Sequence, residues 1–275
     1  MARLFGLIGN RGDLAGRVLA HESKALRVRA QGPMGWGLGF YQGGEVLIRR
    51  RPIDDREEID VAKNAGDVRA DVLVGHVRTP TTGNLRTENT HPFRYRQWLF
   101  AQAGTIDKID LLRDRLLANV PEFLRGDIRG ETDAELVFHV ALSFLHDAGK
   151  LQDGAVEAPS VRDALRATKA MIDAMMAEVG GKPCALNLLM TNGETMVSLH
   201  AGAPMAYVEL AGKADADALI GDDVQLRRRA PELARMHFVL LASDFDEPPG
   251  GRFKELPSPS LVTLTRDVAP TTEPL

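Results

Sequence analysis

The sequence contains a single cysteine, Cys184, among its 275 residues. One thiol excludes an internal disulfide and any metal site built from several cysteines. Proteins without disulfides are typical of reducing compartments, so we predict a cytoplasmic protein. The seven histidines show no paired helical spacing with acidic residues, so we predict no metal site and no cofactor.

Long apolar runs and excess positive charge are also missing. No stretch of about eighteen apolar residues occurs, and the residues after Met1 lack the apolar segment of a signal peptide, so we expect neither a membrane span nor a leader. The formal net charge of -4 and the pI near 6.0 give no basic footprint for nucleic acid or an anionic membrane. We interpret the local run 49–51, three arginines, as the solvated rim of a strand.

The composition is that of one globular unit, with 44% hydrophobic and 26% charged residues. This is enough material for a well-filled core. No internal repeat and no linker divides the chain. We therefore predict a single domain over residues 1–267, followed by a flexible tail over 268–275, because that last segment is rich in proline and threonine.

Apolar periodicity predicts strands at both ends of the chain and helices between them. The predicted helices cover 14–26, 108–117, 132–145 and 161–179. The predicted strands cover 5–8, 45–50, 71–78, 98–101, 185–190, 196–200, 205–209, 237–243 and 261–265. The order lacks regular β-α-β alternation, so we predict the α+β class, with helices layered on mostly antiparallel sheet.

Two segments carry further local signals. The stretch 31–41, with four glycines, predicts a backbone that passes close to another strand or to a ligand. Thr132 and Glu135 form a capping-box pattern at a helix start, with Asp133 in the first turn, where the helix dipole favours a carboxylate.

Polar loops follow the predicted strand 71–78, which places His76 and Arg78 on the same side. The segments 79–83 and 87–93 are dense in hydroxyl and amide side chains. Such loops at strand ends are consistent with a pocket for a polar ligand.

Six motifs occur together in one order and spacing: Arg3–Gly6, Gly35–Phe40, Gly75–Thr79, Glu88–Phe93, Ala103–Ile106 and Gly130–Glu135. Together they resemble the class II glutamine amidotransferases of the N-terminal-nucleophile hydrolase fold. The resemblance is nearest to small stand-alone members that begin Met-Cys-Arg-Leu-Phe-Gly. It implies a four-layer αββα sandwich of mostly antiparallel sheets.

In that family an N-terminal cysteine, exposed by removal of the initiator Met, attacks the glutamine amide, and an Asn side chain and a Gly N–H form the oxyanion hole. Ala2 stands at the cysteine position here, and Ala103 stands at the oxyanion Asn position. The resemblance therefore predicts no catalytic residue. It implies that Arg78 binds the α-carboxylate and that Asp133 binds the α-ammonium of an amino acid. The other ligand positions that it implies are Thr81, Thr82, Asn89, His91, Gly104 and Thr132.

Each of these residues also has an ordinary structural interpretation. Arg78 can anchor a loop, His91 can be a core histidine, and Asp133 can be a helix-end carboxylate. Cys184 enters a predicted buried strand, and we interpret it as a small core residue and not as a replacement nucleophile.

Three hypotheses remain open. The first is an inactive family member that binds an amino acid, a protein partner or a second copy of itself. The second is an enzyme whose cysteine at position 2 has been replaced by alanine; Ala103 and Met34, where relatives often have Asn and Asp, are further departures that count against it. The third is a purely structural assembly protein.

Overall fold

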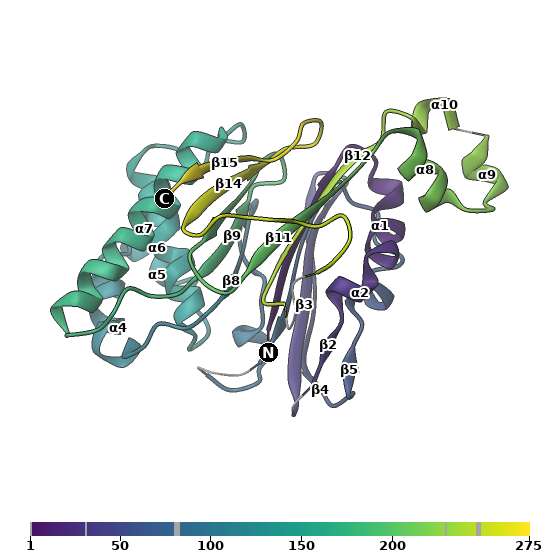
Figure 1. The fold of residues 1–275 in the computed structure, drawn as a ribbon. Helices are drawn as coiled ribbons and strands as arrows, with labels where there is room; N and C mark the ends of the chain where they lie inside the picture. The colour runs from purple at the N-terminus through teal and green to yellow at the C-terminus, as the bar shows by residue number, and fades with distance from the viewer. Residues whose placement is uncertain (1, 31, 80–82, 229, 246–248) are drawn as a thin grey trace.

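The structure is a computed structural model that describes residues 2–30, 32–79, 83–228, 230–245 and 249–275. Two antiparallel sheets lie face to face, and helices cover the outer face of each (Figure 1). Three clusters of buried hydrophobic residues fill the three spaces between these four layers. The predicted α+β class and αββα sandwich are confirmed.

The first sheet has seven strands, with the N-terminal strand at its centre. Its order is β13 (Lys254–Glu255), β11 (Met205–Ala211), β12 (His237–Ser243), β1 (Arg3–Gly9), β6 (Val72–Arg78), β3 (Met34–Gln42) and β4 (Glu45–Asp54). Every residue of β1 is buried. A strand buried on both faces reads as a continuous apolar run, which explains the sequence of this segment.

The second sheet has six strands and carries the longer helices. Its order is β15 (Thr271–Pro274), β14 (Ser260–Leu264), β10 (Met196–His200), β9 (Asn187–Thr191), β8 (Trp98–Ala103) and β7 (Phe93–Tyr95). A separate two-stranded sheet joins β2 (Val28–Arg29) to β5 (Glu58–Ile59).

The helices fall into two groups (Figure 1). On the second sheet lie α4 (Ile109–Ala118), α5 (Glu122–Arg125), α6 (Asp133–Asp147) and α7 (Ala158–Glu178). The first sheet is accompanied by η1 (Gly12–Leu14), α1 (Ala15–His21), α2 (Ser23–Leu26), α3 (Val61–Asn64), α8 (Gly212–Ile220), α9 (Val224–Arg227) and α10 (Ala230–Leu233). A short 3-10 helix, η2 (Thr87–Asn89), follows β6. No helix of the described chain is both long and apolar enough to cross a membrane.

Three local predictions need correction. The single helix expected over 14–26 is broken at Glu22, where ψ is 16°. The capping box forms only in part: Thr132 Oγ1 accepts from the N–H of Glu135 at 3.2 Å, but the Glu135 carboxylate accepts from Arg129 and Gly130 instead of the cap residue. The segment expected to be a frayed tail contains β15, which pairs with β14 along Ser260 to Thr263.

The glycine-rich strand β3 packs closely against another segment. A Cβ at Gly37 would lie 2.1 Å from the carbonyl oxygen of His91, and one at Gly39 would lie 2.7 Å from Pro92 Cγ. These glycines therefore leave room for the segment that carries His91. The close approach predicted for this stretch is to a neighbouring segment of the chain and not to a ligand.

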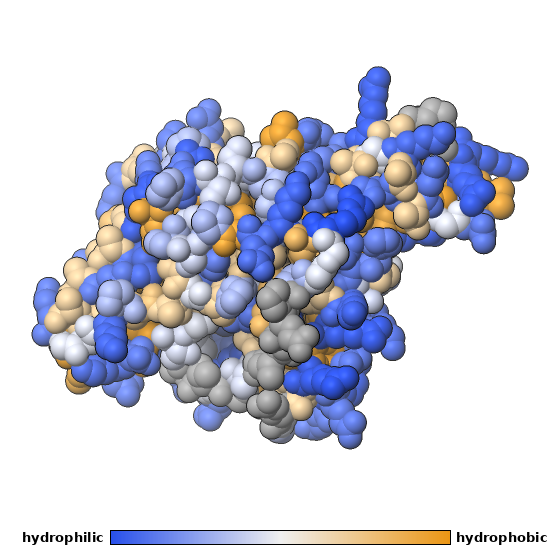
Figure 2. All heavy atoms as spheres, viewed as in Figure 1, coloured by the Kyte–Doolittle hydropathy of each residue, from blue (hydrophilic) through white to orange (hydrophobic). Residues whose placement is uncertain are grey.

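The face seen in Figure 2 is mainly hydrophilic, with hydrophobic residues interspersed in small groups. Scattered exposed apolar residues are normal for a folded protein and do not by themselves indicate an interface.

Candidate functional site

The start of β1 fixes the position of Ala2. Strand β1 pairs with β6 in a register that sets Arg3 opposite Val77, so one further step along the register sets Ala2 opposite Arg78. Arg3 holds the strand end in place, because its Nη1 donates to the Ser243 carbonyl at 3.2 Å and its guanidinium lies 4.8 Å from the Phe245 ring centroid. The half-buried side chain at this point is a methyl group.

Arg78 anchors the loop that follows its strand. Its Nη1 donates to the Asn84 carbonyl at 3.1 Å, and its Nη2 donates to the Gly83 carbonyl at 3.0 Å. Burial lowers the pKa of the guanidinium, and the charge of Asp133 opposes this shift. The loop-anchor interpretation of Arg78 is thus observed, and an acidic partner lies within electrostatic range.

Asn89 bridges two loops with its buried amide. Its Nδ2 donates to the Asn84 carbonyl at 3.0 Å, and its Oδ1 accepts from the Glu131 N–H at 2.8 Å. The side chain is 1% exposed. Asn89 therefore connects the loop held by Arg78 to the segment that leads into α6.

Asp133 holds the turn after β8. Its Oδ2 accepts from the Ile106 N–H at 2.8 Å and from Gln102 Nε2 at 3.4 Å. Burial raises the pKa of this carboxyl, and the hydrogen bonds to backbone N–H groups oppose that rise. Thr132, the neighbouring residue and another expected ligand position, caps α6 and is buried.

The positions of the family's oxyanion hole lie at the end of β8. Ala103 is 4% exposed, and the β8–β9 register sets it opposite Asn187. The Asn187 amide does not replace the missing one, because it is bonded to the backbone of Gly202 and Ala203 at 3.0 and 2.8 Å.

Gly104 is required by the backbone at this point. Its φ is 94°, and a Cβ there would lie 2.2 Å from the Ala185 carbonyl oxygen. An L side chain at this φ is strained as well as obstructed.

His91 forms a buried pair with His76. Their ring centroids are 4.2 Å apart, and none of the four ring nitrogens has a hydrogen-bond partner among the described residues. Burial lowers the pKa of His76 to about 3, and Arg78 adds to the effect. The pKa of His91 is also held well below its usual value, first by burial and then by His76, Arg78 and Arg50. Both imidazoles are therefore neutral.

The structure gathers most of the expected residues around the ends of β1, β6 and β8 and the start of α6. Thr81 and Thr82 lie outside the described residues. The sequence did not predict that Gln102 would contact Asp133, or that His76 would pack against His91. Strand alternation, which places His76 on the same side as Arg78, was a signal that could have included His76 among the candidate residues.

Two further expectations concern other chemistry. Cys184 is 6% exposed, belongs to a hydrophobic cluster, and has a thiol pKa raised to about 11, mainly by burial. Its interpretation as a core residue is confirmed. In the described part of the chain, no group of three or more His, Cys, Asp or Glu side chains is arranged to hold a metal.

Comparison with known proteins assigns the family. Residues 1–247 match the family model of class II glutamine amidotransferases. The chain is 31% identical over 216 residues to the probable glutamine amidotransferase DUG3 of Saccharomyces cerevisiae, a match that covers 67% of this chain and 60% of the yeast protein. The chain thus spans less than two thirds of that relative.

Solved structures agree in fold. A glutamine aminotransferase class-II domain protein from Silicibacter pomeroyi aligns with a TM-score of 0.62 at 15% identity, over 99% of this chain and 97% of that one. The glutamine phosphoribosylpyrophosphate amidotransferase of B. subtilis aligns with a TM-score of 0.55 at 14% identity, over 99% of this chain and 49% of that one. At such identities these matches show the fold alone, and the family follows from the sequence match: the chain belongs to the class II glutamine amidotransferases.

Proposed function

We propose that this chain is a catalytically inactive, stand-alone member of its family that retains a pocket for glutamine or glutamate. The observation that carries the proposal is the methyl group of Ala2 opposite Arg78, where the family places a thiol. A methyl group forms no thioester, so the covalent route is absent. Ala103 removes an oxyanion donor as well, a loss that typically lowers the rate by about 10²–10³.

The retained charges suit a zwitterionic ligand. Arg78 and Asp133 are both buried, carry opposite charges and interact electrostatically. A guanidinium is the side chain best matched to a planar carboxylate, and a carboxylate is a natural partner for an ammonium group. Gly104 is also retained at the position where the resemblance places an oxyanion N–H donor.

A second candidate is the structural assembly protein with a filled pocket. It is favoured by one specific observation: Arg78, Asn89 and Asp133 all make hydrogen bonds to backbone groups of their own chain. On this account the family's ligand-binding side chains have become supports for the loops around 83–84 and 104–106.

Calorimetric titration with L-glutamate and L-glutamine separates the two candidates. Saturable binding that is lost in Arg78→Met supports the amino-acid pocket. The matched control is Arg86→Met, because Arg86 lies in the same loop region with its side chain 57% exposed, and this variant should bind like the wild type. Absence of binding to either amino acid overturns the pocket and leaves the assembly role.

Ammonia release from L-glutamine tests the loss of catalysis. The wild-type protein, with its mature N-terminus determined by mass spectrometry, should release no ammonia above the Arg78→Met background. Ala2→Cys should restore measurable turnover, and Ala2→Cys with Ala103→Asn should exceed it. Glutamine hydrolysis by the wild type that disappears in Arg78→Met would refute the proposal. A cysteine codon at position 2 of the native gene would instead establish the enzyme with a replaced nucleophile.

A further inference from the structure

Strand β4 is an edge of the first sheet and β7 is an edge of the second, and these two edges lie next to one another. Two arginines join these edges. Arg94 of β7 donates from Nη1 to the Val46 carbonyl of β4 at 3.0 Å, and Arg50 of β4 donates from Nη2 to the carbonyl of Pro92, next to β7.

Arg50 corrects the prediction that 49–51 is a solvated rim. Alternate residues of a strand face opposite sides of the sheet. Arg49 and Arg51 are exposed and form ion pairs with Asp67 and Asp54, whereas Arg50 is half-buried and faces the second sheet.

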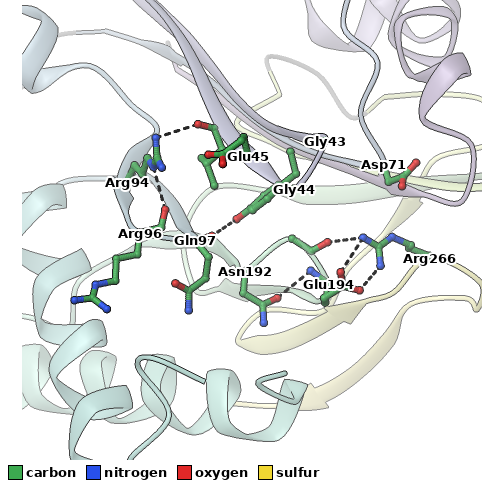
Figure 3. Close-up of a pocket in the computed structure, with 13 residues that line it drawn as sticks. Gly43, Gly44, Glu45, Asp71, Arg94, Arg96, Gln97, Asn192, Glu194 and Arg266 are labelled. Atoms are coloured by element: carbon green, nitrogen blue, oxygen red, sulfur yellow. Dashed lines mark hydrogen bonds and ion pairs between the residues drawn. The ribbon is translucent and has the colours of Figure 1, made fainter. Parts of the chain in front are cut away.

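Two cavities open along this side, and their polar groups differ in how fully they are paired. The first has a volume of about 420 Å³ and lies by the Gly43–Gly44 turn (Figure 3). Arg266 and Glu194 point toward one another there and form an ion pair, and Arg94 is bonded to the carbonyls of Val46 and Arg96. The charged groups Arg266 and Glu194 in this cavity already bind one another, and Arg94 is held by backbone carbonyls.

The second cavity has a volume of about 620 Å³ and lies between β4, β7, η2 and the start of α6. Phe93 and Tyr95 give it an apolar wall, and Arg50, Glu135 and His139 line it from β4 and α6. Sites for small ligands have volumes of about 300–1,000 Å³ and combine apolar walls with a few polar groups. We call this space the edge cavity.

His139 presents an unsatisfied acceptor. The side chain is 2% exposed, and its Nδ1 lies 2.8 Å from the Glu135 carbonyl oxygen. A carbonyl only accepts, so Nδ1 carries the proton. Burial lowers the pKa of this imidazole and so favours its neutral form, in which Nε2 carries a lone pair. That nitrogen has no hydrogen-bond partner among the described residues.

Arg50, which also lines the edge cavity, has an unsatisfied donor. Its Nε is buried and has no partner among the described residues. Buried polar groups normally find a partner, and each one left without a partner destabilises the folded state. Arg50 and His139 thus line one cavity, and each has a buried nitrogen without a partner from the described chain.

We propose that the edge cavity binds a second zwitterion, either a free amino acid or a dipeptide. Its carboxylate lies at Arg50 and its ammonium group at His139 Nε2. The charge on the walls supports this assignment, because four arginines and three carboxylates line the cavity. A simple anion would meet the carboxylates and a simple cation would meet the arginines, whereas a zwitterion satisfies both. Arg78 and Asp133 do not line this cavity, so the site is separate from the amino-acid pocket proposed above.

Glycylglycine is the probe, and the ring C–H signal of His139 in ¹³C-resolved NMR is the readout, identified by its loss in His139→Gln. Glycylglycine should shift this signal saturably. N-Acetylglycine lacks the ammonium and glycinamide lacks the carboxylate, so each should bind at least about tenfold more weakly. Once the His139 signal is identified, the three probes are compared on the wild type, so this comparison holds even if Arg50→Met fails to fold.

Variants then locate the site. Arg50→Met should weaken glycylglycine binding by roughly tenfold or more, since a hydrogen bond to a charged group is lost. Arg51→Met is the matched control on the opposite face of β4 and should bind normally. The His139 signal reports on the edge cavity, which Arg78 and Asp133 do not line, so this site can stand or fall independently of the first pocket. The proposal is overturned if the His139 signal does not respond, if N-acetylglycine binds as tightly as glycylglycine, or if Arg50→Met has no effect.

Discussion

Replacing Asn89 tests whether this amide is a structural bridge. In Asn89→Ala the hydrogen bonds to the Asn84 carbonyl and the Glu131 N–H, 3.0 and 2.8 Å long, both disappear. A net hydrogen bond contributes about 1 kcal/mol, and a buried partner left unpaired adds a further penalty of about 1–3 kcal/mol. We therefore expect the free energy of unfolding to fall by about 2–4 kcal/mol.

The assay is equilibrium unfolding in urea at pH 7. Asn119→Ala is the matched control: Asn119 is exposed, and its amide makes one bond to the Arg115 carbonyl within its own helix. Its removal should change the free energy of unfolding by less than about 0.5 kcal/mol. Equal effects of the two substitutions would refute the bridge.

Asn89→Asp sharpens the test. One carboxylate oxygen can still accept from Glu131, but the other replaces a donor and faces the Asn84 carbonyl oxygen. At neutral pH this variant should be at least as unstable as Asn89→Ala. Protonation of the new carboxyl would restore a donor, so its deficit relative to the wild type should shrink as the pH falls toward 4. A deficit independent of pH would contradict the assigned geometry.

Three further predictions concern Gly104, Glu135 and Cys184. Gly104→Ala should lower the free energy of unfolding by at least about 2 kcal/mol, because it combines positive-φ strain with a collision against Ala185; Gly180→Ala, at φ 66° with open space around it, should lose only about 1 kcal/mol, and equal losses would contradict the collision. Burial raises the pKa of Glu135, so the folded state binds its proton more tightly than the unfolded state does, and stability from this group is lost as the pH rises from about 4 through the folded-state pKa. Urea midpoints measured between pH 4 and 7 should therefore fall with rising pH in the wild type relative to Glu135→Gln, and parallel profiles would contradict the shift. With its pKa near 11, the Cys184 thiol should react with a disulfide reagent at pH 8 at least roughly a hundredfold more slowly in native than in unfolded protein; comparable rates would show that it is accessible.

The arginines of β4 show how a local pattern and a tertiary contact differ. Three consecutive arginines at 49–51 suggested a segment exposed to solvent throughout. Because side chains alternate along a strand, Arg50 points to the opposite face from its two neighbours. Its bond to Pro92 joins the edges of two different sheets. The alternation was available from the sequence, whereas the identity of the facing segment was not.

Periodicity, turn chemistry and motif order determined the element sequence, the layered class and the family, because these depend on residues close together in the chain. They also identified the methyl groups at Ala2 and Ala103 and the burial of Cys184. Only the tertiary structure decided that Asn89 bridges residues 84 and 131, that His91 pairs with His76, and that His139 faces a cavity with Arg50. Those contacts arise where strands and helices distant in sequence pack together, and partner choice there is set by the geometry of the layers, which no local pattern encodes.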